Sequence, residues 1–432
     1  MSTTLSAFAT VPRWPVLFLT VVLLSLLAMA RPLSLHAAPP IEVASGQPLP
    51  DSCQEGVLPS GALWLICVPA SDWNGDVVLW AHGYTAFNEP LGFQNLYLGS
   101  LYLPDVVQAL GYAFATTSYR VNGLAILEGA DDMRELVAAF PAVAGQAPDH
   151  TFLTGASEGG IISTLLAEQS PELFDGALAL CGPVGNFRAQ INYFGDGRVL
   201  FDYYFPGVLP GSPINIPNFV INNWETIYLP AVQQAIANDP QAALELVQVA
   251  RAAYDPNDFS TVENTVETIA WYSVFATNDA NAKLNGNAFG NQRRIYSGSS
   301  NDPLLNQSVQ RIAPDLSTFL TVPQYQTSGN LTIPVVNMHT TLDEQIPYWH
   351  QLLYRAKVNA AGAGDNLTTI PIARYGHCDF TPFEALGAFA LLVYQSTGDV
   401  PDGLTMLDID ALNAEAAASN TEIPAYALGA ER

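Results

Sequence analysis

The chain has 432 residues, of which 49% are hydrophobic and 13% are charged, so it can bury a large core. Its net charge of −25 argues against a nucleic-acid partner, because phosphate binding requires clustered Lys and Arg, and the only lysines are Lys283 and Lys357. The low charged fraction also argues against an acidic halophilic surface, so we interpret the charge as keeping the protein soluble.

The first 38 residues have the order of a secretory signal peptide. Arg13 is followed by an apolar run at residues 14–30 and then by small residues that include Ala30 and Ala37. We expect cleavage after Ala30 or near Ala37, and a secreted or extracytoplasmic mature protein with no stable membrane insertion. The apolar run is also about long enough for a membrane anchor, which stays as an alternative.

Four cysteines in an exported chain favour two disulfides, and four cysteines allow three pairings. Cys53 and Cys67 flank a short segment that reads as a turn entering a strand, so they are the natural local pair. This pairing leaves Cys181 with Cys378. Buried free thiols remain the alternative.

The first half of the chain alternates between strand and helix patterns. Residues 41–69 read as short strands with turns, and residues 76–81 as a buried strand that ends in His-Gly-Tyr. Helical spacing follows at residues 103–111 and 129–144, with a strand at residues 112–119 between them. This order predicts a mostly parallel sheet with helices on both faces.

Residues 154–160 (TGASEGG) place Ser157 between two glycines, after a strand-like run and before a helix-like run at residues 161–169. This context predicts a nucleophile elbow, G-x-S-x-G, in which a sharp strand-to-helix turn exposes the serine. Glycines flank the serine because side chains there would collide. A plain glycine-rich turn is the alternative.

The alternation stops after a further strand at residues 176–180. Residues 186–331 are rich in aromatics and prolines and contain helical stretches at residues 230–238 and 241–254. We predict that they form a mainly helical cap inserted after the sixth strand. Some of its rings could face the substrate and others must fill the core of the cap; the candidates for substrate contact are Tyr193, Phe201, Tyr203 and Phe205.

The sheet resumes at residues 333–339, followed by a turn that carries Asp343 and Glu344. A helix at residues 349–359 and a strand at residues 367–372 come next. The segment Gly-His-Cys-Asp-Phe, which contains His377, then precedes a helix at residues 383–394.

With these motifs in place, the chain resembles the α/β-hydrolase superfamily, in particular secreted bacterial members of the prolyl-oligopeptidase-like and esterase-like kind. Four motifs carry the resemblance: His-Gly after an early strand, Gly-Ala-Ser-Glu-Gly-Gly, Asp-x-x-x-Pro after a late strand, and Gly-His-Cys-Asp-Phe. It covers residues 75–182 and 333–397. The implied domains are a hydrolase core at residues 39–185 and 332–432 and a cap at residues 186–331.

The resemblance implies a catalytic triad of Ser157 as nucleophile, His377 as base and Asp343 as acid. A serine hydroxyl needs a neighbouring base, and an imidazole titrates near neutral pH. The carboxylate orients the imidazole and stabilises the imidazolium. Glu344, next to Asp343, is the alternative acid. The backbone N–H groups of Tyr84 and Glu158 are expected to form the oxyanion hole.

The remaining candidates in the sequence have simpler interpretations. We expect His82, His339 and His350 to be structural, and the carboxylate of Glu158 to be solvated or salt-bridged. Neither clustered metal-ligand spacing nor a phosphate-cradling glycine loop occurs, so we expect no metal and no cofactor.

The sequence thus predicts an exported serine hydrolase that cleaves small or oligomeric carboxylic esters through an acyl-enzyme. A peptidase or amidase with the same triad is the first alternative. Prolyl oligopeptidases carry a propeller before the catalytic domain, and too little chain precedes Asp76 to build one, which favours esters. A catalytically silent binding protein is the second alternative.

Overall fold

The computed structural model describes residues 51–419. The predicted signal peptide and both candidate cleavage sites lie outside these residues. Among the residues described, no helix is both long enough and apolar enough to cross a membrane.

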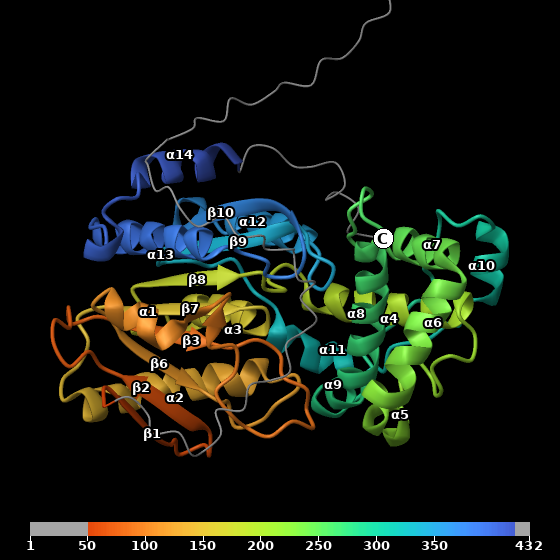
Figure 1. The fold of residues 1–432 in the computed structure, drawn as a ribbon, viewed down its shortest axis with the longest axis horizontal. Coiled ribbons are helices and arrows are strands. Elements are labelled where there is room, and N and C mark those ends of the chain that lie inside the picture. Colours follow the sequence, from red (N-terminus) through yellow and green to blue (C-terminus); the bar gives the residue numbers. More distant parts are fainter. Residues whose placement is uncertain (1–50, 420–432) are drawn as a thin grey trace, which may run out of the picture. The chain divides into compact units, whose positions relative to one another are not determined.

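An eight-stranded sheet forms the centre of the described chain, in the order β1-β2-β6-β3-β7-β8-β9-β10 (Figure 1). The strands are β1 (Cys53–Val57), β2 (Leu63–Cys67), β3 (Val77–Ala81), β6 (Ala113–Thr117), β7 (Thr151–Ala156), β8 (Gly176–Leu180), β9 (Val335–Leu342) and β10 (Leu367–Tyr375). β2 pairs antiparallel with β1 and β6, and the other pairings are parallel. This is the α/β-hydrolase fold, so the predicted fold class is confirmed.

Helices cover both faces of the sheet because successive strand residues point to opposite sides. In β3, Val77 and Leu79 pack into one hydrophobic cluster, while Val78 and Trp80 pack into another. The first cluster includes side chains of α2 (Ile126–Ala144), α3 (Glu158–Gln169) and α12 (Trp349–Ala360). The second includes side chains of α1 (Leu103–Ala109), α13 (Pro382–Thr397) and α14 (Ile409–Ser419).

Short elements connect the larger ones. They are the ribbon of β4 (Tyr97–Leu98) and β5 (Leu101–Tyr102), and the 3₁₀ turns η1 (Pro171–Leu173), η3 (Val322–Tyr325), η4 (Gly364–Asn366) and η5 (Asp402–Leu404). β10 runs three residues beyond the predicted end of its strand, with an irregularity between Ile372 and Tyr375. Helix α14 lies in the C-terminal tail, whose polar and alanine-rich sequence did not reveal its packing.

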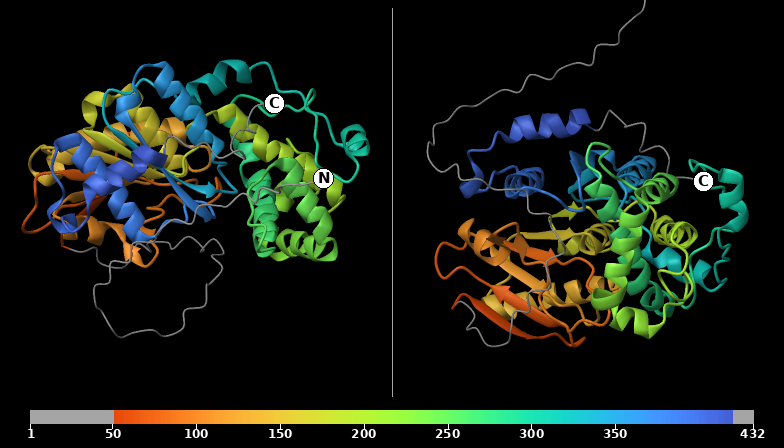
Figure 2. Two further views of the ribbon diagram at one scale, coloured as in Figure 1. Left: turned by 90° about the horizontal axis from the view of Figure 1, so that it is seen from above. Right: turned by 45° about the vertical axis from the view of Figure 1, so that its right-hand side comes forward.

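The segment between β8 and β9 is mainly helical and has its own hydrophobic core. Its elements are α4 (Phe187–Tyr204), α5 (Asn218–Asn222), a π-helical turn η2 (Trp224–Tyr228), α6 (Leu229–Asn238), α7 (Pro240–Ala250), α8 (Ser260–Phe275), α9 (Thr277–Lys283), α10 (Asp302–Ser308) and α11 (Thr318–Thr321). The core includes Phe201, Trp224 and Ile269. We call this segment the cap. Its helices lie together beside the sheet, on the right in Figure 1, and not over one of its faces (Figures 1 and 2).

Candidate active site

Ser157 occupies a sharp turn between β7 and α3. Its φ is 58°, in the left-handed region that residues other than glycine rarely adopt, and its N–H donates to the Leu180 carbonyl at 2.9 Å. A side chain at Gly155 would clash with the Gly159 carbonyl, and one at Gly159 with the Ala81 carbonyl. The glycines therefore let the start of α3 lie directly against the ends of the neighbouring strands.

The three side chains of the predicted triad meet at the carboxyl edge of the sheet. Ser157 Oγ lies 2.9 Å from His377 Nε2, and His377 Nδ1 lies 2.7 Å from Asp343 Oδ2. The serine follows β7, the aspartate follows β9 and the histidine follows β10. The result is a continuous hydrogen-bonded chain from hydroxyl to carboxylate.

The electrostatics of the pair keep Asp343 ionised and His377 basic. Burial opposes the ionised carboxylate, but the charge of His377 and hydrogen bonds from His339 and His377 outweigh it and lower the pKa of Asp343 to about 2. Burial likewise opposes a charged imidazole, but the charge of Asp343 and the hydrogen bond to it raise the pKa of His377 above its ordinary value.

Asp343 has three hydrogen-bond partners and a fourth close polar contact. Oδ1 accepts the backbone N–H groups of Gln345 (2.9 Å) and Ile346 (2.8 Å). Oδ2 faces His377 Nδ1 and, at 3.2 Å, His339 Nε2. The expectation that His339 is only structural therefore omitted a direct contact with the predicted acid.

Glu344 lies beside this pair but faces elsewhere. Its Oε1 accepts from the Gln345 amide at 3.3 Å, and its backbone carbonyl accepts from the Tyr193 hydroxyl at 2.6 Å. Burial, and then the charge of Asp343, raise the pKa of Glu344. Of the two carboxylates, Asp343 is thus the one placed to orient His377.

The loop after β3 adjoins the nucleophile, as an oxyanion loop must. A Cβ built on Gly83 would lie 3.3 Å from Ser157 Cβ, and the Gly83 N–H donates to Asn95 Oδ1 at 3.0 Å. Tyr84 follows in this loop. Glu158 is the first residue of α3, where backbone N–H groups have no partner within the helix. Both positions agree with the predicted oxyanion donors, whose role stays a prediction.

The Glu158 side chain corrects the sequence interpretation. It is only 6% exposed, its Oε1 accepts the Ala125 N–H at 2.8 Å, and its Oε2 has no hydrogen-bond partner in the described chain. Burial raises the pKa of Glu158 to about 8. The carboxyl is thus neither solvated nor salt-bridged, because α3 carries it under the loop that precedes α2.

Two other histidines hold loops. The His82 ring stacks on Tyr119 at 3.9 Å, with Nδ1 2.7 Å from the Gly83 carbonyl. His350 Nδ1 accepts the Gly185 N–H at 2.9 Å. In the described chain, neither ring hydrogen-bonds to Ser157, Asp343 or His377, in keeping with a structural role.

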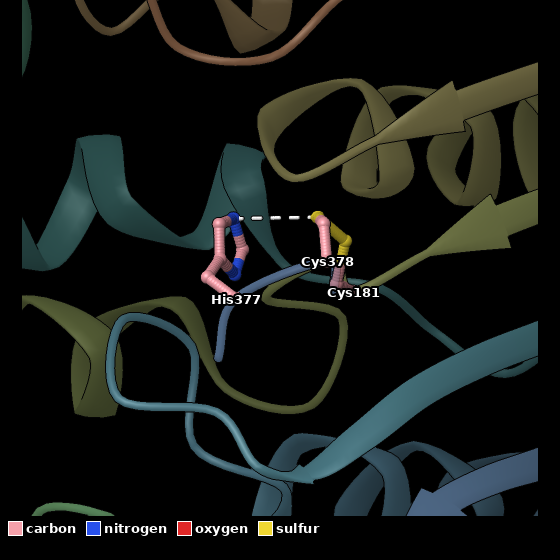
Figure 3. Close-up of side chains that lie close together, drawn as sticks. All are labelled: Cys181, His377 and Cys378. Carbon is pink, nitrogen blue, oxygen red and sulfur yellow. Dashed lines mark hydrogen bonds between the residues drawn. A yellow bond between two sulfur atoms is a disulfide. The ribbon is translucent and has the colours of Figure 1, made fainter. Parts of the chain in front are cut away.

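Both predicted disulfides are present. Cys53 and Cys67 lie directly opposite each other on β1 and β2, with a Cα–Cα distance of 3.9 Å. Cys181, after β8, joins Cys378 with a Cα–Cα distance of 5.5 Å. Figure 3 shows this second bridge beside the His377 ring, and Cys378 Sγ lies 3.5 Å from His377 Nε2.

The same three residues are the one group of potential metal ligands in the described chain. Cys181, His377 and Cys378 offer atoms within 4.8 Å of one another. Metals bind the thiolate form of cysteine, however, and both sulfurs are in the bridge. With the bridge intact, these residues do not fit a metal ion.

The structure separates the four cap candidates. Tyr193 reaches the turn of the predicted acid through its hydroxyl. Phe201 and Phe205 are buried in the cap core with ring centroids 5.3 Å apart, and Tyr203 packs edge-on against Tyr204. Phe201 is eight residues after Tyr193 on α4, which at 1.5 Å per residue places it about 12 Å farther along the helix.

Helix α8 supplies contacts that sequence reasoning missed. The Tyr84 hydroxyl donates to the Phe275 carbonyl at 3.2 Å, and the Tyr272 hydroxyl donates to Gln345 Oε1 at 2.9 Å. The Tyr375 hydroxyl, two residues before His377, lies 3.0 Å from Thr265 Oγ1. One cap helix thus touches the loop of Tyr84, the turn that follows Asp343 and the end of β10 next to His377. No motif marks α8 in the sequence.

No family model and no curated protein matches the chain. Among solved structures, it is similar to the acylaminoacyl peptidase of Pyrococcus horikoshii, with TM-score 0.45 and 11% identity over 83% of this chain and 44% of the peptidase. It is also similar to Candida antarctica lipase A in its closed state, with TM-score 0.41 and 14% identity over 81% of this chain and 78% of the lipase. A Pyrococcus furiosus esterase gives TM-score 0.37 and 10% identity over 76% of this chain and 82% of the esterase. The chain spans less than half the length of the peptidase.

Proposed function

We propose that the chain is a serine hydrolase that cleaves carboxylic esters through an acyl-enzyme on Ser157. The observation that carries this proposal is the unbroken chain of contacts from Ser157 Oγ through His377 to Asp343, at 2.9 and 2.7 Å. A hydroxyl in this position can be deprotonated as it attacks a carbonyl carbon.

In the proposed mechanism, Ser157 Oγ attacks the ester carbonyl while its proton moves to His377 Nε2. Asp343 stays ionised and stabilises the imidazolium. The N–H groups of Glu158 and Tyr84 stabilise the oxyanion of the tetrahedral intermediate. His377 then protonates the leaving alcohol as the acyl-enzyme forms. Water, deprotonated by His377, attacks the acyl-enzyme, and His377 returns this proton to Ser157 Oγ as the acyl–Oγ bond breaks and the carboxylic acid leaves.

The test combines a fluorophosphonate probe with paired ester and amide chromogenic substrates. We expect the probe to label the protein, and Ser157→Ala to abolish labelling and lower kcat by about 10⁵–10⁶-fold. Ser163→Ala is the matched control, because the Ser163 hydroxyl donates to the Gly159 carbonyl within α3. If Ser157→Ala keeps wild-type turnover on every ester, the assignment is wrong. Faster cleavage of the amides would favour a peptidase or amidase.

The same substrates decide which carboxylate is the acid. Asp343→Asn is expected to lower kcat by about 10⁴-fold. The carboxylate no longer holds His377 in the tautomer with a proton on Nδ1, and no negative charge stabilises the imidazolium. Glu344→Gln is the matched control, since Glu344 has no hydrogen bond to His377 among the described contacts. A larger loss in Glu344→Gln than in Asp343→Asn would reverse the assignment.

We further propose that the protein is exported, on the N-terminal sequence pattern and the two disulfides, which persist in oxidising compartments. The mature chain is expected to begin between Arg31 and Ile41. N-terminal sequencing of the protein from each cell fraction tests this. A chain that keeps residues 1–30 and sediments with membranes would support an anchor.

We also propose that residues 186–331 act as a cap that controls access to Ser157. Support comes from helix α8, which contacts the loops that carry Tyr84, Gln345 and Tyr375. In this proposal, a substrate reaches Ser157 between the cap and the sheet edge. Tyr193→Phe, which removes the contact between the cap and the Glu344 carbonyl, is expected to change both KM and stability, and Phe201→Ala, in the cap core, to change stability more than KM.

A further inference from the structure

We propose that His339 is a positioning residue for Asp343, and that it acts by donating a hydrogen bond to the same carboxylate oxygen that receives His377. This inference rests on the proposed function. His339 lies in β9, four residues before Asp343, and its side chain is fully buried. Its Nε2 is 3.2 Å from Asp343 Oδ2 and 2.8 Å from the Ile346 carbonyl.

The hydrogen-bond partners determine which ring nitrogen of His339 carries a proton. Nε2 faces two oxygens that only accept, so it carries a proton: its hydrogen bond is to the Ile346 carbonyl at 2.8 Å, and the Asp343 carboxylate lies 3.2 Å away, within reach of the same N–H. Nδ1 lies 2.7 Å from the side-chain amide nitrogen of Gln351, on α12, and accepts from it. The Gln351 contact therefore sets the tautomer and holds the ring in the plane that points Nε2 at Asp343.

The turn after β9 makes this contact specific. Asp343 Oδ1 accepts the N–H groups of Gln345 and Ile346, which fold the turn back toward β9. The fold brings the Ile346 carbonyl to His339 and leaves Oδ2 between His339 and His377. With donors on both oxygens, the carboxylate cannot rotate without breaking several hydrogen bonds.

A second donor on Oδ2 also weakens the pull of the carboxylate on His377, because the negative charge is shared between two N–H groups. Other titratable groups around this site are Glu344, Tyr193 on α4, Tyr272 on α8, Tyr375 on β10 and His350 on α12. All of them remain in the variants that test His339. A change in the titration of His377 can then be assigned to the lost donor.

The experiment follows His377 directly, by the low-field proton NMR resonance of its Nδ1–H in the full chain as a function of pH. In His339→Leu, we expect the titration midpoint to rise by about half to one pH unit, because Asp343 then pulls more strongly on the imidazolium. We expect kcat to fall about tenfold with KM nearly unchanged, since the carboxylate loses one of the contacts that fix its orientation toward His377.

His339→Gln is the rescue variant, because its amide nitrogen can donate from nearly the same position as Nε2. It is expected to restore both the midpoint and kcat. Replacing the other buried histidine of this region, His350→Gln, serves as the matched control and should leave the midpoint in place. If His339→Leu does not fold, Gln351→Leu takes its place, with a smaller shift in the same direction.

Two results would overturn the proposal: a wild-type midpoint in His339→Leu, or an equal shift in His339→Leu and His339→Gln, which would mean that packing and not donation matters. The NMR titration needs no turnover. A wild-type protein that neither hydrolyses esters nor takes the fluorophosphonate label would therefore refute the proposed function, while the midpoints would still decide the role of His339.

Discussion

In the proposed mechanism, His377 sets the pH range of activity, because only the neutral imidazole can accept the proton of Ser157. Its pKa is raised by the charge of Asp343 and the hydrogen bond to it, against the opposing effect of burial. Activity is therefore present above this raised pKa and is lost as the pH falls through it.

We accordingly expect the acid limb of the kcat/KM profile to have its midpoint above about 6.5, the value of a free histidine. The pH–rate profile of ester hydrolysis measures it. In Asp343→Asn, the residual activity should show a lower midpoint, because the counter-charge is lost. An acid limb below that of free histidine in the wild type would contradict this account.

Glu158 is a second residue whose pKa departs from its ordinary value. Its pKa is about 8 in the folded protein, against an ordinary value of 4.5, because its carboxyl is buried with one hydrogen-bond donor. The folded protein thus binds a proton there that the unfolded chain releases. The free energy of unfolding should fall as the pH rises from about 4.5 to about 8.

Glu158→Gln is expected to remove this cost and stabilise the protein at pH 7 by on the order of 2–3 kcal/mol, with no gain at pH 4. The neutral amide keeps an oxygen for the Ala125 N–H. Urea unfolding of both proteins across this pH range measures the difference. Glu172→Gln, at an exposed site, is the control and should leave the pH dependence unchanged. A gain that is equal at all pH values would contradict the prediction.

At the scale of elements, the packing of α3 against β3 decides whether the elbow can form. Gly159, in the first turn of α3, lies against the carbonyls of Ala81 and His82, so that a Cβ would be 2.8 Å from the second and closer still to the first. Backbone atoms cannot move aside without shifting a central strand.

Gly159→Ala should therefore destabilise the fold by about 3 kcal/mol or more and abolish fluorophosphonate labelling. Urea denaturation and labelling measure both effects. Gly92→Ala is the matched control, because the nearest atom to its Cβ would be 3.6 Å away. A Gly159→Ala protein as stable and as reactive as the wild type would show that α3 can shift.

At the scale of the whole molecule, the Cys181–Cys378 bridge joins parts of the chain that are 197 residues apart and that enclose the cap. Cross-linking so long a loop is worth about 5 kcal/mol in the chain-entropy model. The bridge also fixes the residue next to His377. Loss of the bridge should thus affect both the stability and the geometry of the triad.

We expect Cys181→Ala/Cys378→Ala to lose kcat under conditions where circular dichroism still reports a folded protein. Cys53→Ala/Cys67→Ala is the control, because that bridge closes a separation of only 14 residues on the edge strands. It should lower stability, by about 3 kcal/mol, and leave kcat unchanged. Full activity in the first variant would leave that bridge with a purely structural role.

The sequence alone determined the fold class and the meeting of Ser157, Asp343 and His377. Each of these residues follows a strand, and parallel strands present their carboxyl ends at one edge of a sheet. The pairing of Cys53 with Cys67 was also accessible, since both lie within one short hairpin.

Only the tertiary structure decided what each side chain faces. The burial of Glu158 depends on Ala125, thirty-three residues away, and the tether of Tyr84 depends on Phe275, 191 residues away. The resemblance favoured Asp343 and left Glu344 open, and the direction in which one turn folds shows that Asp343 is the carboxylate that faces His377. The contact of His339 with Asp343 was likewise visible only in the structure. The periodicity of a sequence shows which residues share a face, but a polar contact depends on how the turns between elements fold.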